Sequence, residues 1–210
     1  MPRQVILLAF FGAAPAGAQP GAICAQSGVV AGGDHTCAFT VLGAAMCSGD
    51  NQFGQVGNGA ISTSVPVPTR VSGLMPATNG AGQPPTFVAG QRHTCAIVLP
   101  GMTPMCWGDR GAGQLGDGQI GGLSLTPVPV VADPAHAPFP AFTLAAGDSH
   151  TCAIDTGLHV QCWGDDRVGQ LGDGRSGAGA SSANPTFPVA APSILDAPAI
   201  GLAGGKVRLP

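Results

Sequence analysis

Short apolar stretches recur along the chain, each bounded by glycine, proline or aspartate. Residues 150–154 (HTCAI) and 159–163 (HVQCW) are two of them, and residues 155–158 (DTGL) between them are typical of a turn in which Gly157 takes the unusual backbone angle. The pattern predicts two antiparallel strands joined by that turn. The stretch 93–97 (HTCAI) has apolar or small residues on both sides, so we expect both faces of its sheet to be buried.

This strand–turn–strand unit occurs three times. Residues 31–59, 89–118 and 146–174 share the skeleton A-G-x-x-H-T-C-A, a variable stretch, C-[WS]-G-D and G-Q-[LV]-G-[DN]-G. The histidines are spaced by 58 and 57 residues, a period that suits a multi-stranded unit. The glycines of the last motif predict a loop with unusual backbone angles. The signature positions are His35, His93, His150, Trp107, Trp163, Gln55, Gln114 and Gln170.

Proline-rich stretches lie between the copies, and residues 126–131 (TPVPVV) are an example. They predict a further strand per unit, with proline at the edge of the sheet. A hairpin with outer strands is what a propeller blade requires. We therefore expect an all-β fold, a partial and open β-propeller of about three blades. Open sheet edges and uncovered blade faces favour self-association or pairing with additional blades.

Composition and charge narrow the classes of protein and partner. The chain has 210 residues, no glutamate, a single lysine (Lys206) and 9% charged residues. Because glutamate and lysine commonly fill exposed helix faces, long surface helices are disfavoured. With a formal net charge of −3, the chain has no excess of basic residues of the kind that bind nucleic acid.

The N-terminus has the pattern of a secretory signal peptide over residues 1–18. Arg3 precedes the apolar run 5–14, and residues 16–18 (AGA) form a cleavage site, so the mature chain is expected to begin at Gln19. A lipid anchor at Cys24 and a buried first strand are the alternatives. The apolar run is too short to span a bilayer and no second run reaches that length, so we expect a secreted or periplasmic protein without a membrane span.

Six of the seven cysteines fall in the repeats, as the pairs Cys37 and Cys47, Cys95 and Cys106, and Cys152 and Cys162. In an antiparallel hairpin centred on Gly157, Cys152 directly faces Cys162. Opposed residues at a closely spaced position are near enough for a disulfide, and export makes oxidation available. The alternatives are zinc, with the histidine two residues before the first cysteine as a further ligand, and free buried thiols.

Catalytic and cofactor motifs are absent from the sequence. The recurring histidines are interpreted as buried rings bonded to neighbouring backbone. Asp50, Asp109 and Asp165, like Asn58, Asp117 and Asp173, recur in every copy, which favours turn capping over chemistry. Calcium is the alternative, although the spacing matches no loop of alternating oxygen ligands. The glycine loops lack the lysine of a phosphate-binding loop, so we expect no cofactor and no resident metal.

The repeats resemble those of the regulator of chromosome condensation family, in the superfamily of the bacterial beta-lactamase inhibitor protein II. The match rests on A-G-x-x-H-[ST]-x-A, W-G-x-[ND] and G-Q-L-G-x-G in the cores 29–59, 87–118 and 144–174 of the mature region 19–210. The resemblance implies a seven-bladed type of propeller, of which this chain has three repeats and the start of a truncated fourth near residue 200. The first copy departs from the signature at Ser48, which stands in place of tryptophan. This departure bears on the packing of the first blade and not on the family resemblance.

The resemblance implies a binding protein and does not identify the ligand. The family includes a nucleotide exchange factor, a light receptor and a beta-lactamase inhibitor. We expect a non-enzymatic secreted or periplasmic module that binds a protein partner or additional blades, with self-association as a further outcome. There are two alternatives. The chain is an inhibitor of a secreted hydrolase, or it is a truncated propeller fragment without independent function.

Overall fold

A computed structural model describes residues 29–40, 43–74, 86–98, 101–174 and 185–191. These residues form three four-stranded antiparallel sheets, here called the first, second and third blades. The first blade consists of β1 (Val29–Ala31), β2 (His35–Phe39), β3 (Ala45–Asn51) and β4 (Ser62–Arg70). The second consists of β5 (Phe87–Ala89), β6 (His93–Val98), β7 (Thr103–Asp109) and β8 (Leu123–Pro129). The third consists of β9 (Ala141–Ala146), β10 (His150–Asp155), β11 (Val160–Gly164) and β12 (Val189–Ala190).

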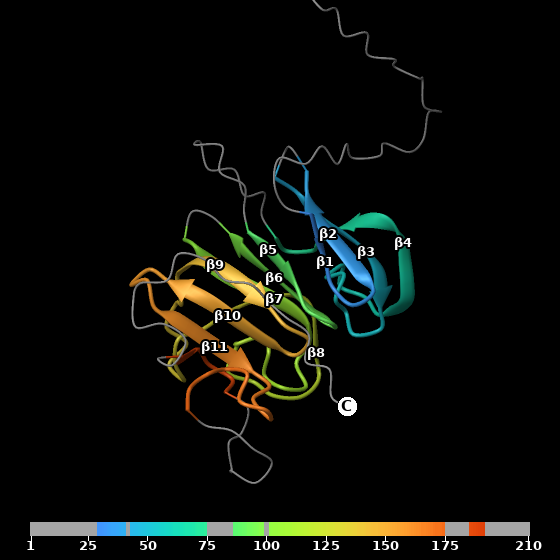
Figure 1. Cartoon of the computed structure of the whole chain (residues 1–210). Helices are drawn as coiled ribbons and strands as arrows, with labels where there is room; N and C mark the ends of the chain where they lie inside the picture. Colours follow the sequence, from blue (N-terminus) through green and yellow to red (C-terminus); the bar gives the residue numbers. More distant parts are fainter. Residues whose placement is uncertain (1–28, 41–42, 75–85, 99–100, 175–184, 192–210) are drawn as a thin grey trace, which may run out of the picture.

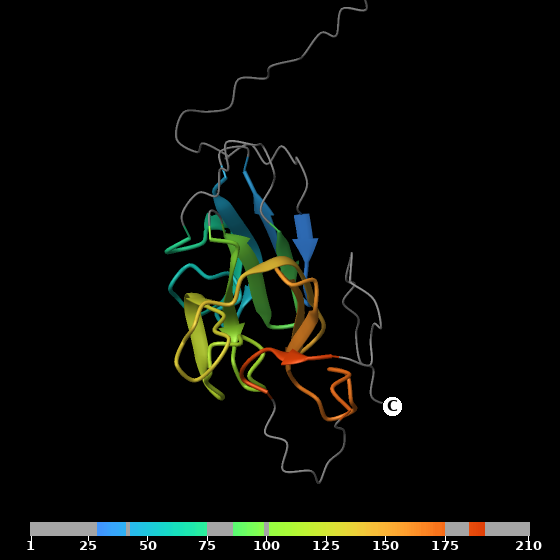
Figure 2. The same ribbon diagram turned by 90° about the vertical axis from the view of Figure 1, so that its left-hand side faces the viewer.

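The blades follow one another in chain order, as Figure 1 shows in blue to teal, green and orange. Strands β1 and β2 contact β5, and β5 and β6 contact β9, so the first strands of the blades lie against each other. Figure 2 shows the same arrangement from the side, with the orange loop after β11 at one end of the molecule. The fold is therefore all-β, an open partial propeller, as the repeat pattern predicts.

The strand register places the cysteines of each hairpin opposite each other. In the third blade Cys152 faces Cys162 and Thr151 faces Trp163, as predicted from the sequence. The return strand begins at Val160, one residue later than expected. Strand β6 is buried along nearly its whole length, because both faces of its sheet are covered.

The turn between β10 and β11 corrects one prediction. Leu158, not Gly157, takes the positive φ, with a value of 64°. The Asp155 carboxylate accepts hydrogen bonds from the backbone N–H groups of Gly157 (2.8 Å) and His159 (2.9 Å), which hold the turn. A Cβ at Gly157 would lie 2.7 Å from Nδ1 of His159, whose exposed ring would have to turn aside.

The outermost strands carry the prolines. Strand β4 includes Pro66 and Pro68, and β8 includes Pro127 and Pro129. Each of these strands pairs with an inner strand on one side only. A missing N–H is tolerated on that free side, which is why the proline-rich stretches become edge strands.

The hydrophobic core lies between the blades. One cluster combines Phe39 and Val56 of the first blade with Phe87 and Trp107 of the second. The next combines Leu115 of the second blade with buried residues of the third, including Trp163. The third cluster consists of third-blade residues only: Ile154, Val160, Cys162, Leu171 and Ala191. Each interface therefore buries apolar groups from two consecutive repeats, and the third blade's cluster has no such contribution from a following repeat among the described residues.

Two expectations concern segments outside the described residues, namely the signal peptide at 1–18 and the fourth unit near 200. Among the described residues, no helix is long and apolar enough to cross a membrane.

Candidate functional site

The signature residues meet at the contact between the first and second blades. The main-chain carbonyl of Gln55 accepts two hydrogen bonds from the second blade, from Oγ1 of Thr94 (2.8 Å) and from Nε1 of Trp107 (2.9 Å). The same Thr94 hydroxyl contacts Nε2 of His35 at 2.8 Å. Histidine and glutamine of one repeat therefore hold threonine and tryptophan of the next.

The contact between the second and third blades repeats this arrangement. The Gln114 carbonyl accepts from Oγ1 of Thr151 (3.0 Å) and Nε1 of Trp163 (2.9 Å), and Thr151 lies 2.9 Å from Nε2 of His93. Because the same atoms pair in the same way twice, the network is a property of the repeat.

This geometry corrects the interpretation of the histidines. The partner of His35 and of His93 is a threonine hydroxyl of the next blade and not neighbouring backbone. Since the Thr94 hydroxyl donates its proton to the Gln55 carbonyl, it must accept one from His35, so Nε2 of this ring carries a hydrogen. Nδ1 of His35 and of His93 is buried without a hydrogen-bond partner in the described structure.

Burial strongly favours the neutral form of these rings. It lowers the pKa of His35 to about 4, although Asp50 and Asp34 act in the opposite direction. Burial, assisted by the nearby His35 and His150, lowers the pKa of His93 to about 3. A charged ring would place a proton on a buried Nδ1 that has no acceptor, so these histidines serve as fixed donors and not as acid–base catalysts.

The glycine three residues before each histidine makes room for the ring. A Cβ at Gly32, Gly90 or Gly147 would overlap the imidazole of the histidine that follows in its own repeat. The backbone N–H of Gly90 donates to the carbonyl of His93 (2.9 Å), which closes the turn before β6. The A-G-x-x-H motif is therefore explained by packing.

The glycine loop carries the acceptor carbonyl. Gly54, Gly57 and Gly59 all have positive φ, as predicted. Gly57 lies directly against the next blade, since a Cβ there would lie 2.6 Å from Nε1 of Trp107. The Gln55 side chain braces the same loop, because its Oε1 accepts from the Phe53 N–H at 2.9 Å.

Five of the six recurring aspartate and asparagine residues cap turns, as predicted. Oδ1 of Asp50, Asp109 and Asp165 accepts from the backbone N–H two residues later. Oδ1 of Asn58 and of Asp117 does the same. In the third blade Arg167 also binds Asp165 through two nitrogens, and although burial alone would raise the pKa of this carboxyl, those hydrogen bonds lower it overall.

The six repeat cysteines form three disulfides within hairpins: Cys37–Cys47, Cys95–Cys106 and Cys152–Cys162. Each pair has its Cα atoms 4.1 Å apart, at a closely spaced position of the ladder. They use the thiolates that the zinc alternative requires. Within the described ranges, no group of three or more potential metal-ligating side chains exists.

Non-reducing peptide mapping is expected to recover these three pairs and to leave Cys24 outside them. Replacing Cys95 and Cys106 together by alanine should lower the free energy of unfolding by roughly 2–3 kcal/mol, because a short loop is no longer closed in the unfolded chain. Cys24→Ala is the matched control and should leave the unfolding curve unchanged. A crossed pairing, or one equivalent of zinc in the native protein, would contradict the assignment.

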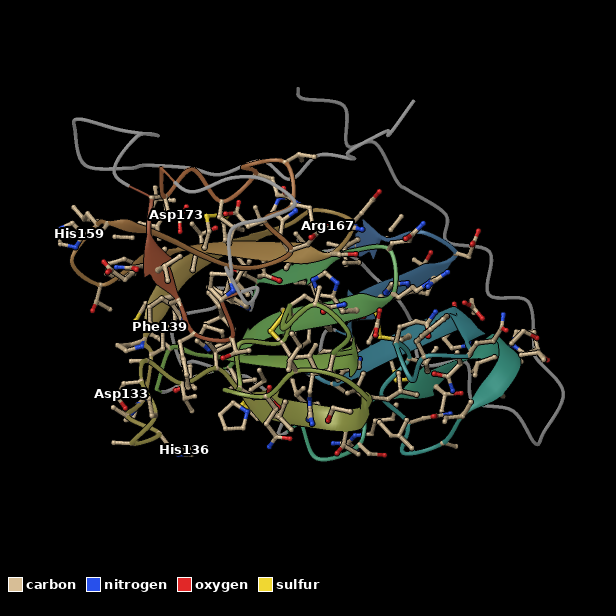
Figure 3. All side chains as sticks on the ribbon, turned by 90° about the horizontal axis from the view of Figure 1, so that it is seen from below. Asp133, His136, Phe139, His159, Arg167 and Asp173 are labelled. Carbon is tan, nitrogen blue, oxygen red and sulfur yellow. A yellow bond between two sulfur atoms is a disulfide. The ribbon has the colours of Figure 1, made fainter. Side chains whose placement is uncertain are left out.

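In the third blade, the positions that contact the following blade in the first two are partly exposed. We call this surface the third-blade face and define it by His150, Val168 and the Gln170 carbonyl. His150 and Gln170 are partly exposed, whereas the equivalent His93 and Gln114 are buried. Val168 is 53% exposed. Beside them lies a hollow of about 330 Å³ lined by these residues with Gln91, Asp148, Ser149, Asp165 and Arg167. Arg167 marks this part of the molecule in Figure 3, on the loop after β11.

The first blade carries, at its outer side, the positions that the second and third blades use to contact a preceding repeat. Thr36 occupies the place of Thr94 and is exposed, and Ser48 faces it across the hairpin, in the place of tryptophan. Since each tryptophan packs against the preceding repeat, Ser48 leaves the core of the first blade intact. Reasoning from the sequence did not identify the threonine or the glutamine carbonyl as part of the interface. The threonine could have been found, because it recurs in all three H-T-C-A motifs.

Comparison with known proteins agrees with this architecture. Residues 27–55 and 143–170 match the family model of the regulator of chromosome condensation (RCC1) repeat. The chain is 35% identical over 147 residues to the ultraviolet-B receptor UVR8 of Arabidopsis thaliana, a match that covers 70% of this chain and 31% of the receptor.

Two solved structures have the same fold. Prp20p from Saccharomyces cerevisiae, studied for its binding to Gsp1p and histones, superimposes with a TM-score of 0.64 at 17% identity over 77% of this chain and 37% of that protein. Yeast RCC1 (Prp20) bound to Kap60 gives 0.64 at 18% identity over 85% of this chain and 39% of the other. The chain thus spans about a third of the length of these relatives. Its repeats, their register and their packing make it a member of the regulator of chromosome condensation repeat family.

Proposed function

We propose that this chain is a non-enzymatic, protein-binding repeat module of a secreted or periplasmic compartment, and that it acts without a cofactor. The observation that carries the proposal is the third-blade face, which presents the residues of a blade-to-blade interface with no mate among the described residues. Its groups are arranged to bind polypeptide, because in the two preceding interfaces they bind threonine and indole side chains.

The compartment is supported by two independent features. Each blade contains one disulfide within its hairpin, and such bonds persist mainly in oxidising compartments. Residues 1–18 have the charge and apolar pattern of a leader.

Binding to proteins is also what the solved relatives do. Prp20p binds Gsp1p and histones, and yeast RCC1 binds Kap60. Their low identity to this chain transfers the fold and not the partner. The partner of this chain is therefore inferred from its own exposed face.

Site-specific photo-crosslinking in the producing cell tests the proposal. A photoreactive amino acid at Val168, on the third-blade face, should give a discrete protein adduct. The matched control is Val67 on the outer strand β4, which is 70% exposed, and it should give none. Adducts of equal yield at both positions, or none at Val168, would reject the binding face. A cytoplasmic protein that retains Met1, rather than one starting at Gln19, would reject the compartment.

A further inference from the structure

We infer that Sγ of Cys152 is a thiol–disulfide exchange site, at which an external dithiol opens the Cys152–Cys162 bond while the other two disulfides stay closed. The inference goes beyond the proposed function, because it concerns the cross-link of the third blade and stands whether or not the chain binds a partner protein. It follows from comparing the surroundings of the three disulfides.

The first two disulfides are sealed between blades. Cys37 and Cys47 belong to a buried cluster that also contains residues of the second blade. Cys95 and Cys106 belong to a buried cluster that also contains residues of the third blade. All four cysteines are 0% exposed. Each of these disulfides therefore lies on the side of its blade that the following blade covers, and a reagent reaches it only after the blades have separated.

The third disulfide has less cover. Cys162 is fully buried, whereas Cys152 is partly exposed, unlike its fully buried equivalent Cys95. Strand β10 is an inner strand that pairs with β9 and β11 (Figure 1), and its opposite face, to which Thr151 and Ala153 point, is 0% exposed at both residues. The open part of Cys152 therefore lies on the face toward which its own side chain points. A reagent in solution can reach this sulfur in the folded protein.

One dithiol balances the exchange at this bond. A thiolate of the dithiol attacks Sγ of Cys152 in line with the sulfur–sulfur bond, and the bonding electron pair leaves on Sγ of Cys162. The second thiol of the dithiol then attacks the reagent's own sulfur in the mixed disulfide and releases Cys152 as a thiolate. Both cysteines take up the protons of the two reagent thiols. The protein thus gains two electrons and two protons, and the dithiol becomes a disulfide.

Opening this bond affects the third blade in particular. Its hydrophobic cluster receives no contribution from a following repeat among the described residues, so its hairpin depends on its own cross-link more than the hairpins packed between two blades do. His150 lies two residues before Cys152 on β10, and the loop with the Gln170 carbonyl follows β11. We therefore expect reduction to loosen the third-blade face, a consequence for binding that rests on the proposed function.

Differential alkylation of the oxidised chain tests the exchange site. Free thiols are first blocked with N-ethylmaleimide, the folded protein is treated with dithiothreitol for increasing times, and new thiols are labelled with deuterated N-ethylmaleimide. Peptide mapping should show Cys152 and Cys162 labelled roughly ten-fold faster, or more, than Cys95 and Cys106, because the sealed bonds wait for the blades to open. The same treatment in concentrated urea is the matched control, in which all three bonds should open at similar rates.

A double variant reproduces the opened bond without a reagent. Replacing Cys152 and Cys162 together by alanine should lower amide protection in β10 and β11 by roughly ten-fold or more, and further than in β6 and β7.

Equal opening rates of the second and third bonds in the folded chain, or faster opening of Cys37–Cys47, would overturn the exchange site. Unchanged protection in β10 and β11 of the double variant would overturn its effect on the third blade. A specific adduct at Val168 in the cell would leave the binding function standing in either case.

Discussion

Replacing Trp107 by alanine is expected to lower the free energy of unfolding by about 3–5 kcal/mol. The side chain is fully buried between the first and second blades, with its edge toward Phe87 at a centroid distance of 6.1 Å. Its loss opens a cavity at the interface and removes one of the two donors to the Gln55 carbonyl. Because neighbouring units stabilise one another in a repeat protein, the first blade should become the least stable part. Urea unfolding followed by circular dichroism measures the change.

Trp107→Phe separates packing from hydrogen bonding. Phenylalanine keeps a six-membered aromatic ring at the interface but loses the rest of the indole and its N–H, while the Gln55 carbonyl keeps its bond from Thr94. We therefore expect a smaller loss than for Trp107→Ala, about 1–2 kcal/mol. Amide hydrogen exchange should show lower protection in β2 and β3 in the alanine variant than in the phenylalanine variant. A loss below 1 kcal/mol for Trp107→Ala would mean that the blades are not coupled through this contact.

Mild acid is expected to destabilise the protein through His35 and His93. In the unfolded chain both rings take up a proton near pH 6.5, whereas in the folded protein burial lowers their pKa to about 4 and about 3. The unfolded state therefore binds more protons below pH 6.5, and stability falls as the pH falls, until each folded pKa is passed. Once the pH is below its folded pKa, His35 should have contributed a loss on the order of 3 kcal/mol and His93 a loss on the order of 5 kcal/mol. Urea midpoints between pH 7.5 and 4.5 cover most of it.

Variants assign this dependence to the rings. His93→Gln should be less stable at pH 7.5 but should lose less on acidification, because the buried titrating group is gone. His136→Asn is the matched control, on an exposed turn with positive φ that Figure 3 shows away from the blade contacts. It should keep the wild-type pH dependence. A wild-type stability that is flat between pH 6.5 and 4.5 would contradict the buried neutral state.

The hairpins and their cross-links could be predicted because both depend on local order. Alternation of short apolar stretches and turns places Cys152 opposite Cys162 by counting alone, and the structure has that register. The same reasoning gave the positive φ of the loop glycines and the prolines on edge strands. It was wrong at the β10–β11 turn, where hydrogen bonds to Asp155 hold Leu158 at positive φ.

Repetition of the signature by itself determined that the protein is a row of three similar β-sheets. Only the tertiary structure decided what the signature residues do. His35 and Thr94 are 59 residues apart, and the acceptor that joins them to Trp107 is a main-chain carbonyl. Every residue has such a carbonyl, so no letter of the sequence marks the one that packing brings to the interface. The same reason explains Ser48, whose position belongs to the contact with a preceding repeat and not to the core of its own blade.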